Sequence, residues 1–286
     1  MLSFLSQPAG FDIGETGLLV YDAAQPIWRA MMVGLGNTLR VCLPALLAST
    51  LLGLLIALGR TSGHRIWRGL AIFYVDSIRN TPVLLQLLMW YFLLVEWLPE
   101  SNAAMQLLPG VWLSKGGLAF PWLIQTTDSA AWIWAWPEQG TFNIVGGAAV
   151  TPEYLALCLA LSIYTSAFLS EVIRSGIEAV PASLIEAAQT LGATRLQQIT
   201  RVLLPQALRA IVPAATNQYL NLIKNSSLAV AVGYPDLVSV GNTAINQTGR
   251  ALECLTVMMS IYLALSLITA SAMNWFNARH ALKGQS

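Results

Sequence analysis

Charged residues are scarce in this chain, and their scarcity excludes most soluble classes of protein. Only 10% of the 286 residues are charged and 56% are hydrophobic, whereas a soluble domain carries about 25% charged residues. The sequence therefore predicts a membrane protein. Its net charge of +1 at pH 7 gives no reason to expect nucleic acid as a partner.

Residues that typically bind metal ions are also few. The chain has three cysteines and two histidines. Cys42, Cys158 and Cys254 lie far apart in apolar segments, so their spacing indicates neither a disulfide framework nor a metal site. We expect no metal site. We also find no acid/base pair or nucleophile arrangement in the apolar segments that is typical of a membrane-embedded enzyme.

A loop that could bind ATP is missing as well. Such a loop needs glycines followed by a lysine and then Ser or Thr, because backbone amides and the ammonium group together hold the phosphates. The three lysines of this chain are followed by Gly116, Asn225 and Gly284. None fits the pattern, so no cofactor is expected on this chain and the chain is not expected to be an enzyme.

Long apolar runs are what the sequence has in abundance. A helix needs about 20 residues to cross a bilayer, and the apolar runs predict five spans at 30–59, 66–99, 154–169, 211–234 and 252–276. The expected fold class is therefore an all-α membrane protein with about five transmembrane helices. The membrane domain takes up residues 30–283, between an outer N-terminal segment at 1–29 and a tail at 284–286.

The distribution of basic residues orients these spans, because cytoplasmic loops carry an excess of Lys and Arg. With an odd number of spans, one side of the membrane holds nine bases and the other holds three. The nine are Arg60, Arg65, Arg68, Arg174, Arg195, Arg201, Arg209, Arg279 and Lys283, and the three are Arg29, Lys115 and Arg250. This predicts an outer N-terminal segment and a cytoplasmic C-terminus.

Two of the predicted spans are interrupted by polar residues. In the second span the residues SIRNTP, which include Pro82, separate two apolar halves, and in the fourth span NLIKNSS surrounds Lys224. The backbone groups freed at a break must be satisfied inside protein rather than lipid. The first break is either a cytoplasmic elbow, where Asp76 and Arg79 are spaced to pair, or a discontinuous helix that lines a pathway. Arg40, the one charge in the first span, either snorkels to the interface or faces the interior.

The segment 234–250 is expected to be a polar outer loop. The longest segment between spans, 99–151, is also expected outside. It contains Glu100, Asp128 and Glu138 against the single base Lys115. Five tryptophans lie in it: Trp112, Trp122, Trp132, Trp134 and Trp136. Indole rings settle at membrane interfaces, and they also anchor protein interfaces. A membrane anchor and a docking surface for an extracytoplasmic partner therefore both stay open.

The segment 179–205 lies between two apolar runs but is too polar to span a bilayer. Pro181 suits the first turn of a helix, and Gly192 suits the position just past its end. Thr194 begins a capping box that starts a second helix, which Pro205 is expected to close. A helical hairpin of this size is marginal in water, so it needs a surface to pack on. That surface is either its own protein or a partner.

The same segment carries a recognisable motif. Glu186-Ala187-Ala188, three residues, Gly192, nine residues and then Val202, one residue and Leu204-Pro205 resembles the EAA loop of bacterial ABC-importer permeases. Further blocks point the same way: GLGNTL at the start of the first span, RNTPVLLQ at the first break, AFLSEVIR before the loop and LIKNSSL after it. Together they resemble the polar amino-acid permease family. The Trp-rich outer segment is similar to that of its general L-amino-acid branch.

This resemblance implies a type I ABC-importer permease fold with a cytoplasmic coupling hairpin. It implies contact with a separate ATPase through Glu186, Ala187, Ala188, Gly192, Leu204 and Pro205, and it places Arg79, Asn80, Lys224 and Asn225 along the translocation path. The implied partners are a cytoplasmic ABC ATPase dimer that binds ATP and Mg²⁺, a second permease subunit (identical or homologous), a periplasmic amino-acid-binding protein and membrane lipid. The implied location is the bacterial inner membrane.

The competing class is a self-sufficient secondary transporter or channel for small polar solutes. Such a protein also places charges near the membrane midplane and breaks its helices. It has no use for a docking hairpin, however, and an ion gradient would drive its transport without ATP.

Overall fold

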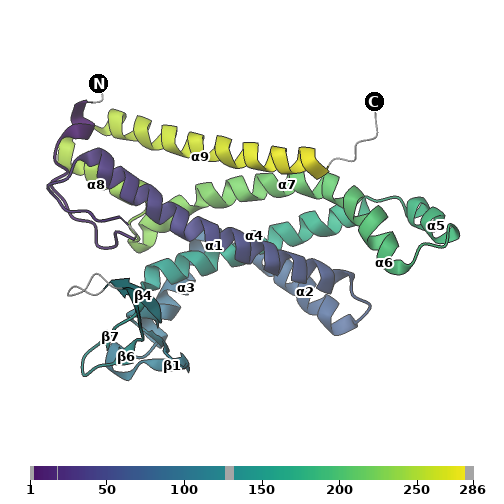
Figure 1. Cartoon of the computed structure of the whole chain (residues 1–286), viewed down its shortest axis with the longest axis horizontal. Coiled ribbons are helices and arrows are strands. Elements are labelled where there is room, and N and C mark those ends of the chain that lie inside the picture. The colour runs from purple at the N-terminus through teal and green to yellow at the C-terminus, as the bar shows by residue number, and fades with distance from the viewer. Residues whose placement is uncertain (1–2, 18, 126–131, 281–286) are drawn as a thin grey trace.

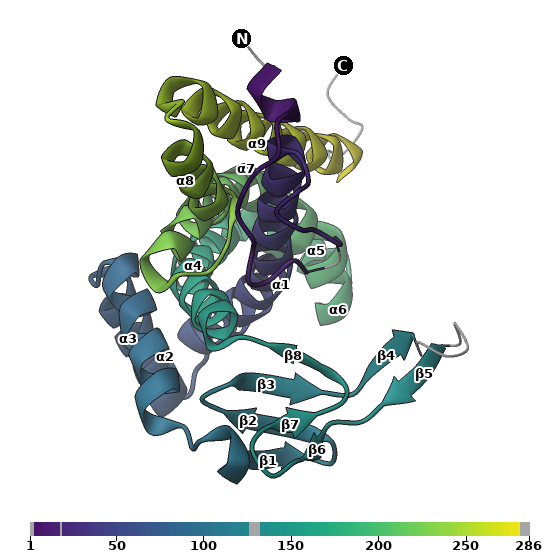
Figure 2. The same cartoon turned by 90° about the vertical axis from the view of Figure 1, so that its left-hand side faces the viewer.

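The structure is a computed structural model that describes residues 3–17, 19–125 and 132–280. It is an elongated bundle of long helices with a small β subdomain on one side (Figures 1 and 2). The short helices α5 and α6 lie at one end of the bundle, and the β subdomain lies toward the other end (Figure 1). The C-terminal tail 284–286 and Lys283 lie outside the described residues.

Three helices among the described residues are long and apolar enough to cross a membrane. They are α1 (Ile27–Thr61), α4 (Pro152–Glu178) and α9 (Ala251–His280). Two bent pairs pass the same test, so the number of spans reaches five if each pair counts as one. This confirms the prediction of about five transmembrane helices. Helix α4 extends past the predicted end of its span because residues 170–178 continue the helix.

The first bent pair joins α2 (Arg65–Arg79) to α3 (Val83–Trp97) at an angle of 104°. Pro82 stands immediately before α3, where its missing N–H costs nothing. The Gln86 amide donates hydrogen bonds of 2.9 Å to the carbonyl oxygens of Ile78 and Thr81. A side chain of the second helix thus satisfies backbone groups that the break sets free.

The second bent pair joins a long first half, which includes α7 (Leu204–Asn225) and a 3-10 helix, η4 (Ser226–Val232), to a second helix, α8 (Leu237–Thr248). The chain turns at Gly233, whose φ of +79° lies in the left-handed region, and enters α8 at 54°. Asp236 caps α8 by accepting a hydrogen bond from the Ser239 N–H at 2.9 Å. The prediction of a polar loop over 234–250 is therefore wrong. Buried residues at helical spacing on one face of α8 outweigh the polar residues on the other.

The described residues of segment 99–151 fold into a small subdomain of short strands, which the all-α prediction did not include. After a 3-10 turn, η2 (Ser101–Ala103), the strands are β1 (Met105–Leu108), β2 (Val111–Ser114), β3 (Gly117–Phe120), β4 (Trp122–Gln125), β5 (Trp132–Ala135), β6 (Glu138–Gln139), β7 (Ile144–Val145) and β8 (Ala148–Val150). They form one antiparallel sheet of order β1-β2-β3-β8 and two hairpins, β4-β5 and β6-β7. Strands of two to four residues are too short for alternation to be readable in a sequence.

The N-terminal segment packs on the bundle instead of leaving it. Phe4, in the 3-10 turn η1 (Ser3–Ser6), is fully buried with residues of α1, α8 and α9. Farther along, Arg40 of α1 forms an ion pair with Glu15 and lies over the Tyr154 ring. Arg40 therefore turns toward protein partners, which decides one of the alternatives left open by the sequence.

Candidate functional site

The helical hairpin begins with α5 (Ala182–Thr190), and Gly192 lies two residues past the end of this helix. The Gly192 N–H donates to the Gln189 carbonyl oxygen at 2.9 Å, and the Ala193 N–H donates to the Ala188 carbonyl oxygen at 3.0 Å. This pair of bonds is a Schellman motif, and it requires the left-handed backbone that Gly192 adopts with φ of +79°. Among the described residues, the two chain neighbours aside, no heavy atom lies within 4 Å of where a Cβ on Gly192 would be, so backbone conformation and not space favours glycine here.

The second helix of the hairpin starts as the capping box predicted. The Thr194 hydroxyl accepts from the Gln197 N–H, and the Gln197 side chain accepts from the Thr194 N–H. The helix does not end at Pro205, however. It passes from α6 (Arg195–Gln197) through a π-helical turn, η3 (Gln198–Leu203), directly into α7.

The reason lies in the π turn itself. A proline inside a helix leaves the carbonyl four residues earlier without its usual donor. Here that carbonyl belongs to Arg201, inside the wider turn of the π helix. Pro205 also stands in the first turn of α7, where a missing N–H is tolerated. The hairpin is therefore joined rigidly to the helix that leads into the second break.

The hairpin presents apolar side chains to its surroundings. Leu191 is 88% exposed and Leu196 is 70% exposed, and Leu184, Ile199 and Leu204 are also exposed. Of the residues that the motif singles out, Glu186, Ala187, Gly192 and Leu204 are exposed, and Ala188 and Pro205 are half-buried. Exposed leucines gathered on one short hairpin are typical of an interaction surface.

The predicted path residues lie at the two helix breaks, but the structure does not bring all four together. Arg79 is at the end of α2, and its guanidinium carbon lies 5.1 Å from the centre of the Phe168 ring. The ion pairs of the described residues do not join it to Asp76. The Asn80 amide donates to the Asp76 carbonyl oxygen at 2.8 Å, so it caps α2.

Lys224 and Asn225 are neighbours in sequence but line different cavities. Asn225 lines a polar cavity of 270 Å³ between α4 and α7, together with Tyr164, Thr165, Phe168, Gln218 and Asn221. Arg79 thus contacts an aromatic ring that lines the same cavity as Asn225. Gln218 and Asn221 were missed by sequence reasoning. The spacing of residues 218, 221 and 225, which puts three side-chain amides on one helix face, could have identified them.

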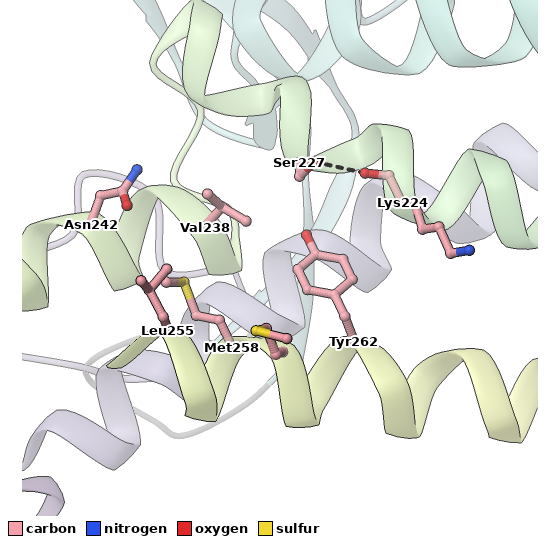
Figure 3. Close-up of a pocket in the computed structure, with 8 residues that line it drawn as sticks. Lys224, Ser227, Val238, Asn242, Leu255, Met258 and Tyr262 are labelled. Carbon is pink, nitrogen blue, oxygen red and sulfur yellow. Dashed lines mark hydrogen bonds between the residues drawn. The ribbon is translucent and has the colours of Figure 1, made fainter. Parts of the chain in front are cut away.

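Lys224 lines an apolar cavity of 410 Å³ between η4, α8 and α9 (Figure 3). Val238 and Asn242 of α8 and Leu255, Met258, Met259 and Tyr262 of α9 line the rest, with Ser227. Figure 3 shows the Lys224 ammonium group beyond Tyr262, on the side away from Asn242. Its side chain is exposed, so the charge sits at the mouth of the cavity.

The tryptophans of the β subdomain are largely on its surface. Trp122, Trp132, Trp134 and Trp136 are all more than half exposed, and the first three belong to the β4-β5 hairpin. Trp112 is half-buried, and its indole N–H donates to the Pro137 carbonyl oxygen at 3.1 Å. Trp112 therefore supports the subdomain, and the other four indoles are exposed, with Trp122 on the face of the β4-β5 hairpin opposite to Trp132 and Trp134.

A multi-pass helical membrane protein with two broken spans beside internal cavities, and with an exposed helical hairpin, has the architecture of a transport permease. Residues 49–281 match the family described as binding-protein-dependent transport system inner membrane component, and the chain belongs to this family. The predicted membrane permease class is thereby confirmed.

The chain is similar to permeases of amino-acid transporters. It is 36% identical to the general L-amino acid transport system permease protein AapQ of Rhizobium johnstonii, over 98% of this chain and 83% of that protein. It is 37% identical to the amino-acid ABC transporter permease protein YhdX of Escherichia coli, over 98% of this chain and 85% of that protein.

Two solved structures share the fold. An amino acid ABC transporter with histidines superimposes with a TM-score of 0.62 at 26% identity, over 87% of this chain and 94% of that one. The inward-facing MetNI methionine ABC transporter superimposes with a TM-score of 0.58 at 17% identity, over 88% and 96%. The predicted ABC-importer permease fold and function are confirmed, and the comparisons do not favour a self-sufficient secondary transporter.

Proposed function

We propose that this chain forms half of the translocation path of an ATP-driven, binding-protein-dependent importer of amino acids. The observation that carries the proposal is the similarity of nearly the whole chain to two amino-acid permeases, over 98% of its length in each case. The chain supplies no catalysis. ATP and Mg²⁺ bind to a separate cytoplasmic ABC ATPase dimer, and a second permease subunit, identical or homologous, completes the path.

The helical hairpin is the contact with the ATPase. Its exposed leucines, above all Leu191 and Leu196, supply apolar area for the groove of a partner. The residues of the EAA-like motif take part: Glu186, Ala187, Ala188, Gly192, Leu204 and Pro205. The hairpin and the C-terminus are cytoplasmic in this proposal, because most bases flank that side.

Arg79, Asn80, Lys224 and Asn225 contribute to the path from the two helix breaks. A fixed positive charge near such a break suits the carboxylate of an amino acid. The separate cavities of Lys224 and Asn225 support a path with two lined regions on either side of α7. The β subdomain lies outside in this proposal, where its exposed tryptophans bind the periplasmic amino-acid-binding protein.

The test is uptake into proteoliposomes that contain the purified permease complex, its ATPase and its binding protein. Individual radiolabelled amino acids are supplied with ATP inside the vesicles, or with an ion gradient and no ATP. The proposal expects uptake that requires both ATP and the binding protein. Uptake driven by an ion gradient alone, or a permease that purifies without any ATPase, would contradict it.

A further inference from the structure

A third cavity, of 720 Å³, lies where the N-terminal segment meets the β subdomain and the helices α1 and α4. The N-terminal segment contributes Glu15, α1 contributes Arg40 and α4 contributes Tyr154. Phe120 and Trp122 of the β subdomain line it as well. None of the four path residues lines this cavity.

An ion pair forms part of the cavity wall. The Arg40 Nη1 atom donates to Glu15 Oε1, and the Thr151 hydroxyl donates to Glu15 Oε2 at 3.0 Å. Tyr154 fixes Arg40 from two sides, since its ring lies 5.1 Å from the guanidinium carbon and its hydroxyl donates to the Arg40 carbonyl oxygen at 3.0 Å. The two charges are therefore held in place before any ligand arrives.

Both charges keep capacity for a ligand. The Arg40 side chain is 30% exposed and the Glu15 side chain 14% exposed. A guanidinium has five N–H donors, and of the guanidinium nitrogens of Arg40 only Nη1 donates a hydrogen bond within the described residues. A carboxylate accepts about four hydrogen bonds, and Glu15 accepts two through its carboxylate.

The chemistry of this wall selects a ligand with two charges. A simple anion is attracted by Arg40 but repelled by Glu15, and a simple cation is attracted by Glu15 but repelled by Arg40, so neither gains much from this wall. A molecule with a carboxylate and an ammonium group close together satisfies both residues. The rings of Phe120 and Trp122, packed edge to face with centroids 5.8 Å apart, offer apolar area to a side chain.

We propose that this cavity binds a free α-amino acid as its zwitterion, at a site separate from the translocation path. The inference goes beyond the proposed function, because import through the path does not require a second site. A lipid headgroup that carries phosphate and ammonium has the same pair of charges, so the experiment includes an arm for it.

The experiment measures equilibrium binding of radiolabelled L-leucine to the complex of permeases and ATPase, without binding protein, in phosphatidylcholine nanodiscs. Saturable binding is expected. N-acetyl-L-leucine lacks the ammonium group and L-leucine methyl ester lacks the carboxylate. Each is expected to compete roughly ten- to a hundredfold less well, because a hydrogen bond to a charged group contributes about 1.5–3 kcal/mol.

Four variants locate the site. Arg40→Gln and Glu15→Gln each remove one charge and are expected to weaken binding roughly ten- to a hundredfold. Because both also loosen the N-terminal segment, Ala149→Phe is added. Ala149 is exposed, lines the cavity and takes no part in the hydrogen bonds of the ion pair, so a phenyl ring there occupies part of the cavity. Ala103→Phe, at an exposed alanine of η2 away from the cavity, is the matched control and should bind normally.

Three outcomes overturn the inference. One is the absence of saturable L-leucine binding, and another is binding of unchanged affinity in both Arg40→Gln and Ala149→Phe. The third is loss of L-leucine binding when phosphatidylethanolamine is added to the nanodiscs, which would make a lipid the occupant. Uptake by the same complex with its binding protein is measured in parallel. If uptake is intact but L-leucine does not bind in the absence of the binding protein, the inference of a second site is wrong and the proposed function is unaffected.

Discussion

The guanidinium carbon of Arg79 lies 5.1 Å from the centre of the Phe168 ring. This contact joins the end of α2 to α4 beside the first helix break, and Phe168 also lines the polar cavity that Asn225 reaches. An aromatic face attracts a cation through its quadrupole. The contact therefore holds a positive charge against a ring that lines the same cavity as the amides of α7.

A double-mutant cycle on this contact tests whether it positions Arg79 for transport. Arg79→Gln removes the charge, and Phe168→Leu removes the ring but keeps an apolar side chain. A cation–π contact contributes about 0.5–1 kcal/mol at an exposed site, so we expect the two changes to be coupled by roughly two- to fivefold in the apparent KM of uptake. Effects that simply multiply would show that Arg79 and Phe168 act independently.

The left-handed turn at Gly192 yields a second prediction. Valine there adds roughly 1–2 kcal/mol of backbone strain and opens the hairpin. We expect Gly192→Val to insert into the membrane normally and to lose copurifying ATPase, as measured by pull-down and ATP-dependent uptake.

Gly249 offers a matched control for this change. It also ends a helix with positive φ, and in the part of the chain that the structure describes, its chain neighbours aside, no heavy atom lies within 4 Å of the position of a Cβ. Gly249→Val therefore applies similar strain to α8 while leaving the hairpin intact, and it should keep its ATPase. Equal ATPase recovery from the two variants would argue against docking through the hairpin.

The hairpin was predictable from sequence because its signals are local. Gly192 after α5 and the Thr194 capping box act over four residues or fewer. The predicted helix end at Pro205 was wrong because the helix continues past Pro205 through a π turn. No residue pattern in the sequence indicates that turn. The strands of the β subdomain were too short to recognise, and α8 was hidden by the polar residues on its outer face.

The cavities could not be predicted because they depend on packing between distant segments. We predicted from the sequence that Lys224 and Asn225 contribute to the same path. Their side chains leave α7 in different directions and line different cavities. Likewise, Arg40 was visible as a charge in an apolar span, whereas its partner Glu15 lies 25 residues away in a segment without regular structure.

Lys224 at the mouth of its apolar cavity gives a third prediction. Lys224→Met removes the charge at similar length. If the ammonium group binds a substrate carboxylate, the apparent KM of uptake should rise roughly tenfold or more, since such a bond contributes about 1.5–3 kcal/mol. Arg209→Met, at an exposed base of the same helix outside the three cavities described above, serves as the control. If uptake and substrate range are unchanged in Lys224→Met, the charge of Lys224 has no role in transport.

The last prediction concerns the aromatic surface of the β subdomain. Trp132 and Trp134 stand two residues apart on β5, so they share one face of the hairpin, and both are more than 60% exposed. Tryptophans on a docking surface often contribute 2 kcal/mol or more.

We therefore expect the double change Trp132→Ser and Trp134→Ser to leave membrane insertion and basal ATPase activity intact. The concentration of liganded binding protein needed to stimulate the ATPase should rise roughly tenfold or more. Phe142→Ser and Val145→Ser remove exposed apolar side chains from the neighbouring β6-β7 region and act as the control. If the tryptophan variant instead fails to insert, the indoles anchor the membrane, and docking moves to α8 and its flanking residues.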